Sequence, residues 1–265
     1  MDLDIEGNAA LVTASSSGLG KASAEALVRE GVSVAINGRR PDVLETTADE
    51  LRDIAPAGTT VLPVPGDLTE PEDIENLVQT TVDEFGGLDH LVTSAGGPPS
   101  GPFVETTDED WYDAYDLLVM SVVRTVREAA DPLRAGAGGT IVNITSRTVK
   151  EAVDQMVLSN AVRMGVIGLE KTLSTELAPD VRANAVLPGS HETSRITDLI
   201  DQGVERGDYD DYQDGLDDRV TEVPLNRLGT TSEFGAAVAF LSSPRSGYIN
   251  GAAIPIDGGS MNANL

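Results

Sequence analysis

The chain has 265 residues, of which 40% are hydrophobic, so it is long enough to bury a sizeable core. Acidic residues outnumber basic ones by 44 to 18, which gives a formal net charge of −26 and a surface that repels nucleic acids and anionic lipids. The lack of cysteine excludes disulfides and thiolate metal sites, and two histidines are too few for a multi-histidine centre, so we expect no metal.

The negative charge is spread along the chain and is densest at 208–218. Self-repulsion of this size destabilises a protein in dilute buffer and is screened within ~3 Å at molar salt. We interpret it as a halophilic adaptation, with an ordinary acidic protein as the alternative. No apolar run approaches the ~20 residues of a membrane helix, and the N-terminus has no signal-peptide pattern, so we expect a cytoplasmic protein without membrane contact.

Short β-branched segments alternate with longer helical patterns along the chain. Strands are predicted at 9–13, 32–37, 60–65, 90–94, 140–145, 182–187 and 252–256. Helices are predicted at 18–30, 41–54, 71–85, 108–134, 154–178 and 230–241. The alternation predicts an α/β fold over 1–265, a single-domain Rossmann fold with a seven-stranded, parallel, doubly wound sheet.

The polar stretch 189–225 interrupts this rhythm after the sixth predicted strand. In open α/β sheets, ligands bind outside the carboxyl ends of the strands. A long insertion at this place is expected to form a lid on the substrate side.

The first predicted strand runs through TASSSGLG, Thr13 to Gly20, directly into a helical pattern. Glycines at such a turn let the backbone approach a pyrophosphate, and the free N–H groups of the helix N-terminus can bind it. This context indicates a dinucleotide site.

The end of the second predicted strand indicates which dinucleotide is bound. The sequence NGRR at 37–40 has no acidic residue to accept hydrogen bonds from a ribose 2′-hydroxyl. Arg39 and Arg40 instead match a 2′-phosphate in charge and geometry, which favours NADP over NAD. The alternative is that both arginines begin a solvated helix.

Together these segments resemble the short-chain dehydrogenase/reductase family over nearly the whole chain. The family's glycine motif is matched except that Ala14 replaces its first glycine, and GDL at 66–68, SAG at 94–96, PG at 188–189 and DGG at 257–259 match further signatures. The resemblance implies that the cofactor is bound by Thr13, Ser15, Ser17, Gly18, Leu19, Gly20, Arg39, Asp67, Leu68, Ser94, Ala95, Gly96, Arg163, Pro188, Gly189 and Thr193.

The family's catalytic residues are Asn, Ser, Tyr and Lys, and the resemblance places only the serine, at Ser146. Ser159 stands where the tyrosine belongs, Arg163 where the lysine belongs, and Leu118 at the asparagine position. A tyrosine titrates near ~10, whereas an aliphatic hydroxyl is a far weaker acid. Arg163 can bind ribose hydroxyls and supply charge, but it cannot pass a proton onward. Tyrosine-dependent carbonyl reduction is therefore not supported.

Lys150 is a candidate for the missing acid/base, because the pKa of a lysine falls readily on burial. In this hypothesis Ser146, Ser159 and Asn160 orient the substrate oxygen. The alternative is that Lys150 is a surface charge paired with a neighbouring carboxylate.

His191 is a second candidate, since it follows the Pro-Gly pair near the nicotinamide and histidine suits proton transfer at neutral pH. The alternative is a solvated loop histidine. His90 begins the fourth predicted strand at the end opposite the site and is interpreted as structural. Tyr209 and Tyr212 lie in the acidic lid, where hydration and mobility explain them better than catalysis.

The leading hypothesis is an NAD(P)-dependent oxidoreductase of this family that transfers a hydride to or from a small polar carbonyl or alcohol with a non-standard proton donor. Arg147, Arg163 and Arg195 at the mouth favour an anionic substrate. The alternatives are an inactive NADP-binding sensor or scaffold, and a lyase or isomerase without net redox. The resemblance also implies a homotetramer or dimer built on 108–134 and 154–178.

Overall fold

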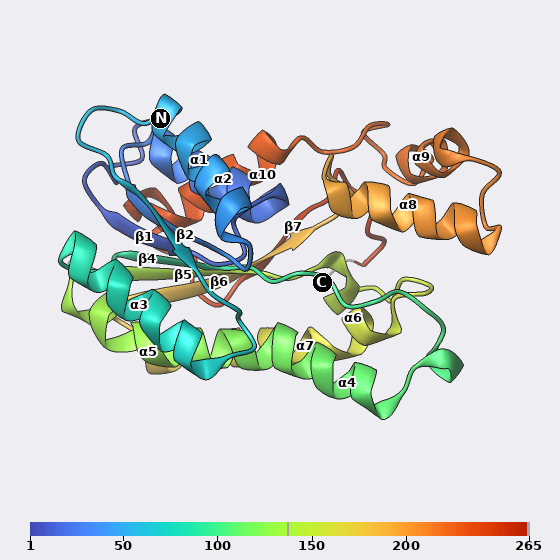
Figure 1. The fold of residues 1–265 in the computed structure, drawn as a ribbon, viewed down its shortest axis with the longest axis horizontal. Helices are drawn as coiled ribbons and strands as arrows, with labels where there is room; N and C mark the ends of the chain where they lie inside the picture. The colour runs from blue at the N-terminus through green and yellow to red at the C-terminus, as the bar shows by residue number, and fades with distance from the viewer. Residues whose placement is uncertain (137, 264–265) are drawn as a thin grey trace.

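The computed structural model describes residues 1–136 and 138–263. Its centre is a seven-stranded sheet in the order β3-β2-β1-β4-β5-β6-β7, in which every neighbouring pair is parallel (Figure 1). The predicted fold class is thus confirmed. The strands are β1 (Ala9–Val12), β2 (Ser33–Gly38), β3 (Val61–Pro65), β4 (His90–Thr93), β5 (Gly139–Ile144), β6 (Val181–Pro188) and β7 (Ala253–Ile256).

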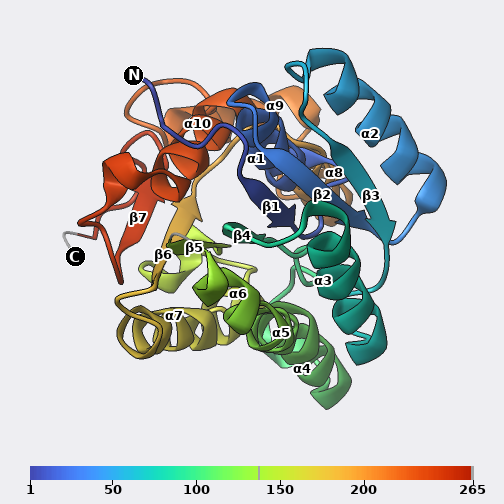
Figure 2. The ribbon, with the colours of Figure 1, turned by 90° about the vertical axis from the view of Figure 1, so that its left-hand side faces the viewer.

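Helices cover both faces of the sheet. Figure 2 shows α1, α2 and α10 on one face and α3, α5 and α7 on the other. The α-helices are α1 (Gly18–Arg29), α2 (Pro41–Ile54), α3 (Pro71–Phe85), α4 (Asp108–Tyr115), α5 (Ser121–Ala135), α6 (Val157–Val162), α7 (Met164–Glu176), α8 (Ser194–Arg206), α9 (Tyr212–Thr221) and α10 (Thr231–Ser242). The shorter helical segments are η1 (Phe103–Glu105), η2 (Asp116–Met120), η3 (Arg147–Val149) and η4 (Pro244–Ser246). Within the described residues, no helix has the length and apolar character to cross a bilayer.

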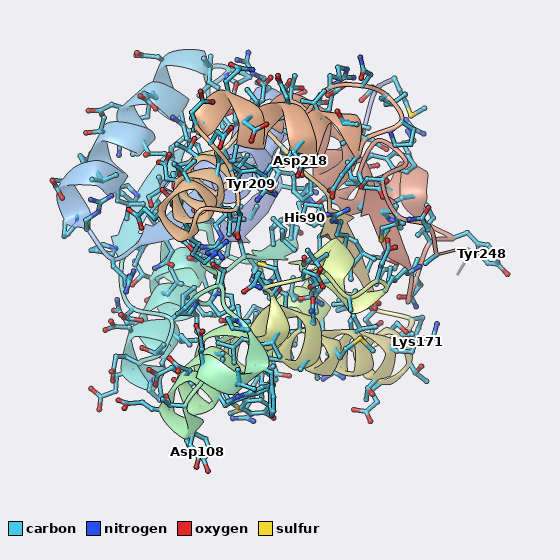
Figure 3. All side chains as sticks on the ribbon, turned by 90° about the vertical axis from the view of Figure 1, so that its right-hand side faces the viewer. His90, Asp108, Lys171, Tyr209, Asp218 and Tyr248 are labelled. Atoms are coloured by element: carbon cyan, nitrogen blue, oxygen red, sulfur yellow. The ribbon has the colours of Figure 1, made fainter. Side chains whose placement is uncertain are left out.

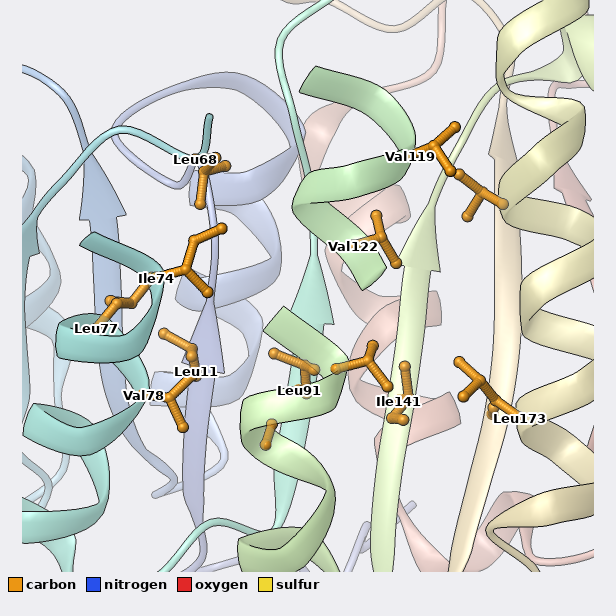
Figure 4. Close-up of a cluster of buried hydrophobic side chains, with 14 of the residues drawn as sticks. Leu11, Leu68, Ile74, Leu77, Val78, Leu91, Val119, Val122, Ile141 and Leu173 are labelled. Atoms are coloured by element: carbon orange, nitrogen blue, oxygen red, sulfur yellow. The ribbon is translucent and has the colours of Figure 1, made fainter. Parts of the chain in front are cut away.

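The core lies in two layers, one on each face, because successive side chains of a strand point to opposite sides. Leu11, Leu91 and Ile141 from three neighbouring strands pack beneath α3, α5 and α7 (Figure 4). The residues that follow them in each strand join the other layer, with Leu27 of α1 and Val238 of α10. Burial on both faces explains why the strands read as continuous apolar runs in the sequence.

Two predicted helices are divided in the structure. The helix predicted at 108–134 contains a π-helical turn, η2, between α4 and α5. The helix predicted at 154–178 begins only at Val157, because Gln155 has a φ of +59°, which is incompatible with a right-handed helix. It is then divided at Arg163, which lies between α6 and α7. The spacing of hydrophobic residues in the sequence predicts neither the π-helical turn η2 nor the division at Arg163.

The segment 189–225, predicted as a polar lid, contains two helices that the sequence analysis missed. Ile196 and Ile200 of α8 are buried against Leu228 and form a small core of their own. Ile196, Leu199, Ile200 and Val204 have helical spacing, so this signal could have predicted α8. The two helices lie beyond the carboxyl end of the sheet (Figure 1).

His90 begins β4 and is buried at the end of the sheet opposite the lid. Its Nδ1 lies 2.8 Å from the Thr140 hydroxyl and its Nε2 lies 2.9 Å from the Asn8 amide nitrogen. Because that amide nitrogen can only donate, Nε2 accepts and the ring is neutral. Burial lowers the pKa of His90 to about 4.

This shift predicts a pH dependence of stability. The folded pKa lies below the unfolded value, so the stabilisation is complete above the unfolded pKa and is lost as the pH falls towards 4. Between pH 7 and pH 4, we expect the unfolding free energy of the wild type to fall about 3 kcal/mol more than that of His90→Gln. Urea unfolding at constant salt measures both curves. Parallel curves would contradict the assignment.

Candidate active site

The sheet order creates a crevice between the carboxyl ends of β1 and β4. The chain continues from β1 to β2 and β3 on one side and from β4 to β5 on the other, so the loops leaving β1 and β4 diverge. Thr13, directly after β1, is hydrogen-bonded to Ser94, directly after β4, at the base of this crevice. Its hydroxyl donates to the Ser94 carbonyl at 2.7 Å and accepts from the Ser94 N–H at 2.8 Å. Thr13 itself is buried and is not among the residues that line the cleft at this point, so its contact with the cofactor stays a prediction.

A cleft of about 1860 Å³ opens at this point, and its lining includes residues of the segment 189–225, the predicted lid. Figure 3 shows the lid helices from the carboxyl end of the sheet, with Tyr209 and Asp218 labelled. The predicted site residues that line the cleft are Ser17, Gly18, Leu19, Gly20, Arg39, Asp67, Leu68, Ser94, Ala95, Gly96, Ser146, Ser159, Arg163, Pro188, Gly189 and Thr193. The structure therefore brings most of the predicted residues together.

The turn between β1 and α1 fits a pyrophosphate. A Cβ on Gly20 would lie 2.5 Å from the Ala14 carbonyl oxygen, and Gly18 has a φ of +57°, so both positions need glycine. Ser17 precedes α1 without capping it through its side chain. The first N–H groups of α1 thus remain available to an anion.

Ser15 does not line the cleft, although it was predicted to bind the cofactor. It is fully buried, and its hydroxyl donates to the Val12 carbonyl at 2.6 Å and accepts from the Asn37 N–H at 3.0 Å. These bonds join the ends of β1 and β2. The turn points this side chain inward, where it supports the site, and a contact of Ser15 with the cofactor stays a prediction.

Arg39 and Asp67 lie together at the other end of the cleft, after β2 and β3. Burial opposes the charged form of Asp67, but hydrogen bonds from Thr69 and the charge of Arg39 hold its pKa below the ordinary value. The Arg39 guanidinium is 3.9 Å from this carboxylate, and its side chain is 78% exposed. Because this ion pair is long and exposed, the Arg39 guanidinium is accessible to a phosphate group.

Three hydroxyl groups gather where β5 ends. Ser146 caps η3 by accepting a hydrogen bond from the Thr148 N–H at 3.2 Å. This turn brings the Thr148 hydroxyl to 3.1 Å from the Ser159 hydroxyl on α6. Thr148 was not predicted from the sequence; a serine whose hydroxyl can accept from a backbone N–H two residues on is a weak signal for this turn.

Arg163 lies one helical turn after Ser159 and is only 9% exposed. Its Nη2 donates to the Gly96 carbonyl at 3.4 Å, and its Nε has no partner among the described residues. Burial, and secondarily the charge of Arg195, lower the pKa of Arg163 to about 10. The group remains protonated at neutral pH, and a buried cation of this kind requires oxygen ligands.

The two candidates for the missing acid/base, Lys150 and His191, are placed differently with respect to the cleft. Lys150 is not among the lining residues of the cleft. His191 reaches the cleft wall, but its ring is buried edge-on against Phe234, with centroids 5.4 Å apart, and burial lowers its pKa. Asn160 accepts a hydrogen bond from the Val153 N–H at 3.1 Å and donates one to the Val153 carbonyl at 2.9 Å. Leu118 is buried, and its neighbour Leu117 lines the cleft instead.

Comparison with known proteins gives a consistent result. A family model described as enoyl-(acyl carrier protein) reductase matches residues 13–261. Nodulation protein G of a Rhizobium species is 32% identical over 257 residues, covering 97% of this chain and 98% of that protein. The short-chain dehydrogenase/reductase SDRA of Arabidopsis thaliana is 30% identical over 259 residues, covering 96% of this chain and 95% of that protein.

Solved structures agree over the same length. L-sorbose reductase from Gluconobacter frateurii, complexed with NADPH and L-sorbose, has a TM-score of 0.93 at 30% identity and covers 99% of this chain and 100% of its own. Actinorhodin polyketide ketoreductase with NADPH has a TM-score of 0.91 at 31% identity and covers 96% of this chain and 97% of its own.

The turn at Ala14 yields a stability prediction. Ala14 has a φ of +44°, in the left-handed region that costs a residue with a Cβ roughly 1–2 kcal/mol. We expect Ala14→Gly to raise the unfolding free energy by about 1 kcal/mol, and Ala26→Gly, inside α1, to lower it by about 1 kcal/mol. Urea unfolding at constant salt compares the two. A loss of stability in both variants would contradict the strained turn.

Proposed function

This chain belongs to the short-chain dehydrogenase/reductase family, and on that basis we propose that it is an NADP-dependent oxidoreductase acting on a small polar carbonyl or alcohol. The observation that carries the proposal is one cleft that joins a glycine turn for a dinucleotide to a hydroxyl cluster beside a buried arginine. Two structural neighbours, a sorbose reductase and a ketoreductase, are NADPH complexes.

NADP fits the residues of the cleft. The open N-terminus of α1 suits its pyrophosphate, and the exposed Arg39 suits its 2′-phosphate. The unpartnered Nε of Arg163 suits the hydroxyls of the nicotinamide ribose. When bound, NADP supplies or accepts the hydride.

The residues of the chain act on the substrate oxygen. Ser146 and Ser159 would orient that oxygen by hydrogen bonds, and Arg163 would stabilise the negative charge that develops on it. Since the pKa of Arg163 is about 10, it keeps its proton and acts by charge. Ser159 and Thr148, joined at 3.1 Å, are the proposed proton relay to water. Neither hydroxyl ionises alone near neutral pH, so their proton transfer must be concerted with hydride transfer.

The test is cofactor consumption in molar KCl, because we propose that the charge of −26 adapts the protein to high salt. A panel of sugar-derived, keto-acid and acyl carbonyls is offered with NADPH, and binding is followed by NADPH fluorescence. We expect turnover with one NADPH consumed per carbonyl reduced, and about 100-fold slower turnover in Ser159→Ala. Lys150→Met, which changes a residue outside the cleft, is expected to leave turnover unchanged.

Each other outcome has a distinct meaning. Binding without turnover across the panel would favour the inactive sensor or scaffold, an alternative supported by the replacement of tyrosine and lysine. Product formed without NADPH consumption would favour a lyase or isomerase. Loss of activity in Lys150→Met with full activity in Ser159→Ala would restore Lys150 as the acid/base. Failure to bind NADPH would overturn the cofactor assignment.

Cofactor choice is tested at the end of β2. A charge-assisted hydrogen bond contributes about 1.5–3 kcal/mol, so we expect Arg39→Asp to weaken NADPH binding by roughly 10- to 100-fold without weakening NADH binding. Arg40→Asp reverses the charge of the neighbouring exposed arginine, which does not line the cleft. It changes the net charge as much as Arg39→Asp and serves as the matched control. If both variants weakened NADPH binding equally, the loss would reflect the change in net charge and not a contact of Arg39 with the 2′-phosphate.

A further inference from the structure

We propose that the substrate carries a carboxylate and that Arg195 and Arg219 of the lid bind it. This inference rests on the proposed function and names the class of its substrate. The lid here means the segment 189–225, which contains α8 and α9.

Among the residues that the structure describes, three arginines of the cleft have no carboxylate partner, although the chain is strongly acidic. Acidic residues outnumber basic ones by 44 to 18, so carboxylate partners are abundant. Nevertheless Arg163, Arg195 and Arg219 all line the cleft, and none has a carboxylate oxygen within 4.0 Å in the part of the chain that the structure describes. Guanidinium groups in a cleft are stabilised by an anionic partner. Three of them without an ion pair therefore indicate that the cleft binds an anionic ligand.

Arg195 is held in place at the start of α8. Its Nη2 donates to the Pro98 carbonyl at 2.9 Å. The guanidinium packs over Gly97, where an added Cβ would lie 2.8 Å from Nη2 and 2.9 Å from Cζ. One nitrogen therefore fixes the group to the loop after β4, and the donors not used in that bond are available to a ligand.

The three positive charges act on one another. Arg163 donates to the Gly96 carbonyl, two residues from the acceptor of Arg195, so both groups are anchored to one short loop. Burial and then the charge of Arg195 lower the pKa of Arg163. Burial also lowers the pKa of Arg195, where Asp198 and Arg219 act in opposite directions. A bound carboxylate would relieve this repulsion.

Arg219 approaches from α9, and its buried Nε has no hydrogen-bond partner in the described residues. Its neighbour Asp218 accepts a hydrogen bond from the Tyr209 hydroxyl at 3.1 Å (Figure 3). The other arginines of this region are engaged, since Arg206 pairs with Asp208 at 3.0 Å and Arg147 with Glu222 at 3.4 Å. The expectation that Arg147 favours an anionic substrate is therefore replaced by one centred on Arg195 and Arg219.

The chemistry suits a carboxylate. Two planar guanidinium groups offer paired N–H donors that match its two oxygens. Arg195 and Arg219 belong to α8 and α9 of the lid, whereas Ser146 follows β5 and Ser159 lies on α6, and all four line the same cleft. A substrate with a carbonyl at one end and a carboxylate at the other would therefore draw the lid over the hydroxyl cluster.

The test is ligand binding rather than turnover. The protein is loaded with NADP⁺, which cannot reduce a ketone, and is titrated calorimetrically at constant KCl with pyruvate, acetoacetate and levulinate and with their methyl esters. The three acids differ in the spacing of carboxylate and carbonyl. We expect at least one acid to bind about tenfold more tightly than its ester, or better. Arg195→Gln and Arg219→Gln are expected to abolish that preference while NADP⁺ affinity changes less than about twofold.

Arg29→Gln is the matched control, because it removes one positive charge far from the cleft and is expected to preserve both affinities. The proposal is overturned if every ester binds as well as its acid, if no acid binds, or if the two arginine variants weaken NADP⁺ as much as the acid. The last result would assign both arginines to the cofactor. Failure of NADP⁺ to bind is seen in the loading step and overturns the proposed function instead, and the acids are then titrated without cofactor.

Discussion

The site depends on one buried positive charge that, within the described residues, has no carboxylate within 4.0 Å. Arg163 is 9% exposed and has a pKa of about 10, and among the same residues the one hydrogen-bond acceptor of its guanidinium is the Gly96 carbonyl. A buried guanidinium is stable only when further oxygens complete its hydrogen bonds. This requirement supports the proposal that the cleft receives oxygen-rich ligands. The hydroxyl-bearing residues Ser146, Thr148 and Ser159 line the same cleft as Arg163.

The sheet supplies the rigid frame for this charge. Hydrogen bonds of Thr13 to Ser94 and of Ser15 to Asn37 fasten β1 to its two neighbours where the cleft begins. The glycine turn, the loop after β4 and η3 all leave from strand ends that cannot move independently. The segment 189–225 differs, because α8 and α9 share only a small core; this supports the proposal that the segment is a lid that closes on a ligand.

The sequence predicted the sheet well because parallel strands buried on both faces are continuous apolar runs, and the glycine turn because only glycine fits at Gly20. It did not predict details that depend on local backbone direction. Ser15 turns inward and Ser17 outward within one turn, Lys150 lies outside the cleft, and Thr148 enters the hydroxyl cluster only because η3 rotates it. The helix α8 was missed although its apolar residues have helical spacing, because the whole segment 189–225 was interpreted from its polar composition.

The measurement that tests this account most directly is a crystal structure of the protein with NADPH at high salt. The account predicts that Arg163 lies within about 3.2 Å of the nicotinamide ribose hydroxyls, with the nicotinamide facing Ser146 and Ser159. It also predicts the pyrophosphate at the N-terminus of α1. A complex in which Arg163 contacts only protein atoms, or in which the nicotinamide lies outside the cleft, would contradict it.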